Sequence, residues 1–115
     1  MQATQPNPAA QLPSRFRIRT LDEASALAHA LSVHFPSPET ARYGIAEMLI
    51  NAIEHGNLGI SYEEKKRLML EGCWHEEVTR RLALPEYAGR YVELHCHMTE
   101  DQIVLSIHDQ GNGFD

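Results

Sequence analysis

Apolar residues recur at helical spacing through the middle of the chain and predict its central helix. One face of this segment is apolar at i, i+3, i+4, i+7 and i+8, where the sequence has Ile45, Met48, Leu49, Ala52 and Ile53. Ser37 and Pro38 suit the start of the helix, as N-cap and first-turn residue. Gly56 and Asn57 suit its end, as a left-handed cap.

A polar face runs along the same predicted helix. Glu47, Asn51 and His55 follow one another at intervals of four residues, so about 6 Å separates each from the next at a rise of about 1.5 Å per residue. No lysine or arginine lies between Tyr43 and Gly59. A carboxylate and a carboxamide in register suit a site that needs oxygen ligands. The alternative is an ordinary amphipathic helix with arbitrary polar residues.

The segment before this helix predicts one strand and one further helix. Residues 15–20 alternate between basic and apolar, which indicates a strand with its two apolar side chains inward. The outward arginines suit an edge strand. Thr20 and Glu23 have the spacing of a capping box, so a helix is expected from Thr20 to a point before Phe35 and Pro36.

Residues 60–84 predict a helical insertion. Ser61 and Glu64 repeat the capping-box spacing. Apolar positions support one or two helices, at Leu68, Leu70, Trp74, Val78 and Leu82. The charged run at residues 63–67 is typical of a solvated helix face rather than a binding patch. Trp74 is expected to pack against the rest of the domain.

The last third of the chain predicts a β-hairpin. Residues 91–98 and 102–108 both alternate between apolar and polar, and residues 99–101 suit the turn between them. The predicted order is a strand, two helices, a helical insertion and a hairpin. This order favours an α+β fold, a two-layer sandwich with helices packed on one face of a mixed β-sheet.

Length and composition indicate one domain. The chain has 115 residues and a mass of 13.0 kDa, with 43% hydrophobic and 23% charged residues, as in ordinary globular proteins. Residues 1–14 lack periodicity and are expected to be a flexible leader or linker. Residues 15–115 are expected to form the domain.

Charge and hydropathy narrow the possible partners and location. The formal charge of −6 argues against direct nucleic-acid binding and against an anionic membrane surface. No apolar run approaches the length of a membrane span. Cys73 and Cys96 lack metal-motif spacing, so free thiols in a reducing cytoplasm are the simplest interpretation.

Three histidines of the predicted hairpin raise the possibility of a metal site. His95 and His97 are two apart on a strand and therefore share one face, with His108 on the next strand. No Cys-x-x-Cys or acidic partner completes such a set. Exposed or hydrogen-bonded histidines are therefore expected, with a metal site as the alternative.

The second candidate motif lies at the end of the chain. A strand pattern runs into Asp109-x-Gly111-x-Gly113, where the glycines allow a close backbone approach. Such a run alone is also a common turn. Together with Glu47-x-x-x-Asn51, however, it resembles the G1 and N boxes of the GHKL, or Bergerat-fold, ATP-binding domains. These include gyrase-type topoisomerases, Hsp90, sensor histidine kinases and MutL. The sequence is most similar to the anti-sigma factor serine kinase branch.

The resemblance implies a role for each matching residue. Asp109 would accept a hydrogen bond from the adenine amino group, and Gly111 and Gly113 would let the loop pass close to the nucleotide. Asn51 would be a ligand of the Mg²⁺ that bridges the phosphates of ATP, in keeping with the preference of Mg²⁺ for oxygen ligands. Glu47 would be the catalytic base that activates a hydroxyl or water. His55 is expected to have a structural role at the helix end, with an approach to the phosphates as the alternative.

The resembled family also has a lid and a further glycine-rich segment after the G1 box. This sequence stops at Asp115, so we expect it to be the N-terminal part of an ATP-binding domain that binds nucleotide weakly or not at all by itself. Neither Asp115 nor Glu54 is expected to have a role beyond capping or solvation.

The resemblance implies a cytoplasmic ATP·Mg-binding domain of a bacterial regulatory protein. Its full-length parent would be a serine/threonine kinase or a nucleotide-sensing output domain. Expected partners are a sigma factor or an anti-sigma antagonist protein, a second copy in a homodimer, or a fused receiver or phosphatase domain. One alternative is a non-catalytic module of the same fold that sequesters a partner through the insertion. The other is an α+β domain in which both motifs are coincidental.

Overall fold

A computed structural model describes residues 15–99 and 102–111. The elements follow one another along the chain as β1 (Arg15–Ile18), α1 (Leu21–Ser32), α2 (Pro38–Asn51), the π-helical turn η2 (Ala52–Asn57), α3 (Tyr62–Leu70), α4 (Trp74–Leu82), α5 (Pro85–Ala88), β2 (Val92–Met98) and β3 (Ile103–His108). Residues 1–14, Gly113 and Asp115 lie outside the described part. No helix within it is both long and apolar enough to cross a membrane.

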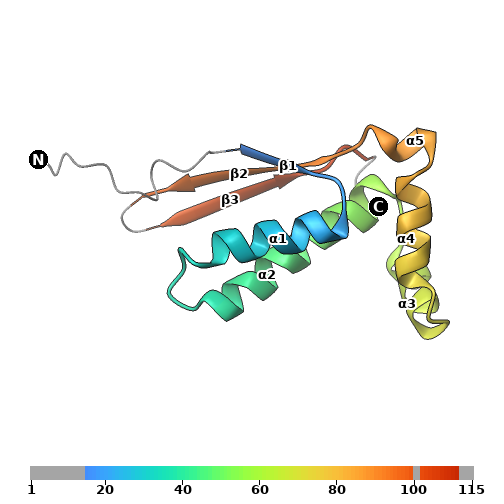
Figure 1. The fold of residues 1–115 in the computed structure, drawn as a ribbon, viewed down its shortest axis with the longest axis horizontal. Helices are drawn as coiled ribbons and strands as arrows, with labels where there is room; N and C mark the ends of the chain where they lie inside the picture. The colour runs from blue at the N-terminus through green and yellow to red at the C-terminus, as the bar shows by residue number, and fades with distance from the viewer. Residues whose placement is uncertain (1–14, 100–101, 112–115) are drawn as a thin grey trace, which may run out of the picture.

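The three strands form one sheet with β2 in the middle. Phe16 pairs with Leu94, and Leu94 pairs with Ile107, both in antiparallel register. α1 and α2 lie together under one face of this sheet (Figure 1). The predicted α+β sandwich is therefore confirmed. The expectation of a mixed sheet is not met in the described residues, because both strand pairs there are antiparallel.

The core lies between the sheet and the two long helices. β2 alternates as predicted, with Val92, Leu94 and Cys96 buried. α1 and the α2–η2 segment contribute the facing side chains, which include Ala24, Ala28, Leu31, Ile45, Leu49 and Ile53. Met48 was predicted to join this face, but 47% of it is exposed.

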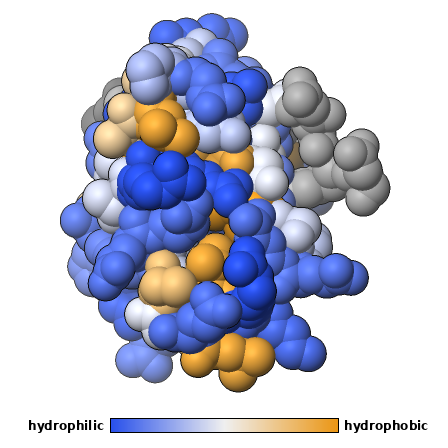
Figure 2. All heavy atoms as spheres, turned by 90° about the vertical axis from the view of Figure 1, so that its right-hand side faces the viewer, coloured by the Kyte–Doolittle hydropathy of each residue, from blue (hydrophilic) through white to orange (hydrophobic). Residues whose placement is uncertain are grey.

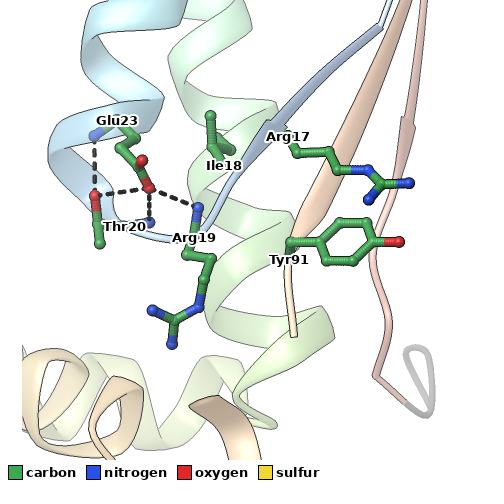
Figure 3. Close-up of a pocket in the computed structure, with 6 residues that line it drawn as sticks. All are labelled: Arg17, Ile18, Arg19, Thr20, Glu23 and Tyr91. Carbon is green, nitrogen blue, oxygen red and sulfur yellow. Dashed lines mark hydrogen bonds between the residues drawn. The ribbon is translucent and has the colours of Figure 1, made fainter. Parts of the chain in front are cut away.

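The start of α1 is fixed by the predicted capping box. Glu23 N–H donates to the Thr20 hydroxyl oxygen at 3.1 Å, and the Glu23 carboxylate accepts from Thr20 N–H at 3.0 Å. The same carboxylate accepts from Arg19 N–H at 2.8 Å (Figure 3). These backbone hydrogen bonds lower the pKa of Glu23.

The outer face of the sheet carries mostly polar side chains, with Val104 as an exposed apolar residue. Glu93 accepts from Arg17 Nε at 2.8 Å and lies 2.5 Å from His95 Nε2. Arg17 also lies over the Tyr91 ring, 4.4 Å from its centroid (Figure 3). The hydrogen bonds from His95 and then Arg17 lower the pKa of Glu93 to about 2. His95 is thus hydrogen-bonded, as expected. No group of three metal-ligating side chains occurs among the described residues.

Three helices make up the insertion. α3 begins with the Ser61 hydroxyl accepting from Glu64 N–H at 3.0 Å, as the spacing predicts. α4 follows after Gly72, which has a φ of 74°. Pro85 then begins the short α5, so the helical part extends to Ala88. The α3–α4 pair stands beside the main sandwich, across the ends of α2 and the sheet (Figure 1).

Candidate functional site

The central helix changes its hydrogen bonding where the predicted site lies. α2 ends at Asn51, and η2 continues it with wider turns, as in the 2.9 Å bond from Leu58 N–H to Ile53 O. Gly56 and Asn57 do not form the predicted left-handed cap. Gly59 has the left-handed conformation instead, with a φ of 67°. The predicted N-cap bond of Ser37 is also missing, since its side chain makes no capping bond.

Burial explains why the helix does not end at the predicted point. All seven residues from Ala52 to Leu58 are buried, so every side of η2 packs against the protein. A π-helical turn adds one residue to a helical turn, and such turns occur frequently at functional sites. The left-handed cap is therefore displaced to Gly59, beyond the buried turn.

One hollow lies between α2 and β3, and we call it the strand-side hollow. Its volume is about 370 Å³, within the range of small-molecule sites. It is lined by Met48, Asn51, Ala52, Leu105, Ile107 and Asp109. Four of these residues are apolar, and Asp109 supplies the carboxylate. The exposure of Met48 is thereby explained, because its side chain lines a hollow rather than the core.

The turn after β3 is held tightly against η2. Asp109 accepts a 3.0 Å hydrogen bond from Gly111 N–H through Oδ1. Gln110 N–H donates to the side-chain oxygen of Asn57 at 2.6 Å. A Cβ on Gly111 would lie 1.6 Å from the carbonyl oxygen of Gly56. A Cβ on Gly56 would lie 2.4 Å from the Asp109 carboxylate. The two glycines therefore permit the close approach that brings Asp109 to the hollow.

A second hollow of about 500 Å³ lies between α2 and α3, and we call it the helix-side hollow. It is lined by Glu47, Asn51, His55, Tyr62, Lys65, Lys66, Met69 and Leu70. Glu47 is exposed there and Asn51 is half-buried. Asn51 lines both hollows, so the two meet at its side chain.

The structure brings together four of the five predicted site residues. Asn51 and Asp109 share the strand-side hollow, and Glu47 shares the helix-side hollow with Asn51. Gly111 lies at the base of the Asp109 turn. Gly113 falls outside the described residues. Residues of the two motifs, at least 58 positions apart in sequence, thus come to one side of the molecule.

Glu54 has a structural role that the sequence does not predict. Its side chain is fully buried, and it accepts from Trp74 Nε1 at 2.7 Å and from Lys65 Nζ at 3.2 Å. The expectation of capping or solvation was therefore wrong. Glu54 ties η2 to α3 and to α4 of the insertion. The expected packing role of Trp74 is confirmed, with this hydrogen bond in addition.

His55 fixes the end of the same helix. Its ring stacks on Tyr62 at a centroid distance of 3.9 Å, and its Nδ1 is bonded to the carbonyl oxygen of Ile60. Because a carbonyl oxygen only accepts, Nδ1 carries the proton in this bond. His55 thus has the predicted structural role at the helix end, while one of its edges lines the helix-side hollow.

Arg81 joins the insertion to the end of the central helix. Its guanidinium donates to Glu77 at 2.7 Å, to Glu64 at 2.6 Å and to the carbonyl oxygen of Leu58 at 3.1 Å. The hydrogen bonds from Arg80 and then Arg81 lower the pKa of Glu77 to about 2. These hydrogen bonds hold α3 and α4 against each other and against Leu58, and α3 lines the helix-side hollow.

The two cysteines are free thiols, as predicted. Burial raises the pKa of the Cys96 thiol. Neither cysteine lines one of the two hollows. The candidate chemistry therefore consists of oxygen and nitrogen groups.

Comparison of the chain with protein-family models, with curated proteins and with solved structures gives no match.

Proposed function

We propose that this chain is the adenine-nucleotide-binding part of a cytoplasmic regulatory protein, with ATP and Mg²⁺ as its ligands. One observation carries the proposal. Asn51 of the central helix and Asp109 of the terminal turn line the same largely apolar hollow. The motif resemblance requires this placement.

The strand-side hollow suits a purine. Met48, Leu105 and Ile107 offer apolar surface to the faces of a flat ring, while Asp109 offers a hydrogen-bond acceptor. Adenine presents an amino donor where guanine presents a carbonyl oxygen. A carboxylate has about four acceptor positions, so Asp109 can accept from adenine while it accepts from Gly111. Preference for adenine follows from this chemistry.

The residues beside this hollow suit the phosphate end of ATP with its metal. Asn51 and Glu47 are one helical turn apart and both line the helix-side hollow. Mg²⁺ takes few protein oxygens and completes its shell with phosphate oxygens and water, so the side-chain oxygen of Asn51 fits such an ion, with Glu47 one helical turn away. When bound, it would neutralise phosphate charge. The carboxylate of Glu47 is exposed and is therefore accessible to a hydroxyl that it could deprotonate as a general base.

A titration with nucleotides tests the proposal. We expect ADP with Mg²⁺ to bind weakly, with a Kd on the order of 1 mM, and GDP to bind less well. Ligand-observed NMR detects affinities in this range. Asp109→Asn is expected to reduce the affinity for ADP by about tenfold, since a hydrogen bond to a charged group is lost. Asp22→Asn on the exposed start of α1 is the matched control. Equal binding of ADP and GDP, or no binding of either, would overturn the proposal.

If the protein is a kinase, phosphate from labelled ATP is expected to be transferred to a serine or threonine of an antagonist protein. The partners would be that antagonist, a sigma factor or a second copy of the chain. Glu47→Gln should then abolish transfer while ADP still binds. Transfer that survives this substitution would exclude Glu47 as the base.

An exposed apolar surface on the insertion favours the second candidate, a module that sequesters a partner without catalysis. Met69 and Leu70 at the end of α3 are 57% and 81% exposed. Figure 2 shows hydrophobic surface at the bottom of this side of the molecule, where Figure 1 places the α3–α4 turn. Stoichiometric binding of the antagonist without phosphate transfer would favour this candidate.

A further inference from the structure

We propose that Lys66 of α3 binds the phosphate groups of the nucleotide. This inference rests on the proposed function, and it assigns a part of the site that neither sequence motif contains. The helix-side hollow provides the position, because both lysines of the sequence line it. The strand-side hollow is lined by no basic residue.

The relation between the two hollows sets the direction of the ligand. They meet at Asn51, which lines both. A nucleotide with its base against Asp109 and its phosphates near Asn51 therefore extends toward the helix-side hollow. There it meets the surface of α3 that carries Lys65 and Lys66.

Electrostatics favours a positively charged side chain at this point, in addition to the proposed Mg²⁺. The protein has a formal charge of −6, and Glu47 places a carboxylate in the helix-side hollow. A polyphosphate close to a carboxylate is repelled unless positive charge lies nearby. The amide side chain of Asn51 is uncharged. The lysines of α3 can supply the positive charge.

The two lysines have different partners. Lys65 donates to the buried Glu54 at 3.2 Å and lies 5.4 Å from the centroid of the Trp74 ring. Its charge is thus matched within the protein. Lys66 is exposed and forms no ion pair with the described residues. The charged run of α3, predicted to be a solvated face, therefore contains one anchored lysine and one lysine that faces the hollow.

The ion pair of Lys65 helps to fix the position of Lys66. Glu54 and Lys65 hold α3 against η2, and the Arg81–Glu64 pair at 2.6 Å holds α3 against α4. Lys66 therefore projects from a braced helix rather than from a loop. A site on a braced helix is more precise than one on a loop.

A phosphate series tests the role of Lys66. Adenosine, AMP, ADP and ATP are titrated into the chain and into Lys66→Gln, with Arg67→Gln as the control. Arg67 is the next residue on the same exposed helix, does not line the hollow and carries the same charge. We expect Lys66→Gln to reduce the affinity for ADP and for ATP by about tenfold and to leave the affinity for adenosine unchanged. Arg67→Gln should change the affinity for each of the four ligands by less than about threefold.

A second readout needs no substitution. Because the sequence has two lysines, acetylation of each is resolved by mass spectrometry, and ATP should protect Lys66 while adenosine should not. If adenosine binds but Lys66→Gln and Arg67→Gln behave alike toward ATP, the role of Lys66 is wrong and the nucleotide site stands. If adenosine does not bind, both proposals fail together.

Discussion

The side-chain oxygen of Asn57 accepts a 2.6 Å hydrogen bond from the backbone N–H of Gln110. Asn57 is buried at the end of η2, and its own carbonyl oxygen accepts from Arg90 at 2.5 Å. One residue thus joins the central helix, the end of the insertion and the turn that carries Asp109. The hydrogen bonds of Asn57 therefore help to hold Asp109 beside Asn51.

Replacing Asn57 should therefore affect stability and site together. Asn57→Ala leaves the Gln110 N–H without this acceptor, so we expect a loss of about 1–3 kcal/mol in the free energy of unfolding. Urea denaturation followed by circular dichroism measures it. Ser106→Ala on the exposed face of β3 is the control and should change stability by less than about 0.5 kcal/mol. Equal effects of the two substitutions would show that the hydrogen bonds of Asn57 contribute little.

Two glycines should respond to alanine in opposite directions. A Cβ on Gly111 would overlap the carbonyl oxygen of Gly56, so Gly111→Ala should destabilise the fold by about 1–3 kcal/mol. A Cβ on Gly44 meets nothing within 4 Å. Because Gly44 is exposed within α2, Gly44→Ala should stabilise the protein by about 0.5–1 kcal/mol. Thermal unfolding of both variants measures the contrast, and a stable Gly111→Ala protein would contradict the close approach.

Loss of the buried carboxylate of Glu54 should detach the insertion. Glu54→Ala removes the acceptor of both Trp74 and Lys65, and we expect it to cost about 2–3 kcal/mol. Lys65 is 22% exposed at its side chain, so its ammonium can turn toward water and limit the cost. Glu63→Ala on the exposed side of α3 is the matched control. Hydrogen exchange of the α3 amides should accelerate in Glu54→Ala only, and unchanged exchange would contradict the anchoring role.

The low pKa of Glu77 predicts a dependence of stability on pH. Its value falls from the usual 4.5 to about 2 in the folded protein, so the unfolded state binds the proton more tightly. The stabilisation is therefore complete above pH 4.5 and is lost as the pH falls through the folded pKa near 2. Glu77→Gln should remove this contribution, of about 1 kcal/mol, because Glu77 is partly buried while its partner Arg80 is exposed to solvent. Urea midpoints between pH 7 and pH 2 measure it, with Glu76→Gln as control. Parallel pH profiles of Glu77→Gln and the unsubstituted protein would contradict the assignment.

The elements with local patterns could be predicted from the sequence. The alternation of apolar and polar residues predicted β1 and the hairpin, and the spacing of Thr20 and Glu23 predicted the start of α1. Both patterns depend only on residues close together in the chain. The four-residue spacing of Glu47 and Asn51 fixed their common side of α2. The approach of Asn51 to Asp109 was expected from the motif pair rather than from any local rule.

The features that were missed depend on contacts between distant residues. Glu54 is buried because Lys65 and Trp74 reach it from the insertion, 11 and 20 positions later. The π-helical turn depends on packing around all of η2, which no helical periodicity encodes. Met48 fits the apolar spacing of the core but lies over a hollow. The position of that hollow is set by β3, more than 50 residues away in the sequence.

The hydrogen bond between Trp74 and Glu54 has a practical consequence. Trp74 is the single tryptophan of the chain. Its indole N–H donates a hydrogen bond to the carboxylate of Glu54, which belongs to the π-helical turn after Asn51. Indole emission responds to the charge and hydration around the ring. The intrinsic fluorescence of the unlabelled protein should therefore report any shift of this turn when a ligand enters the neighbouring hollows.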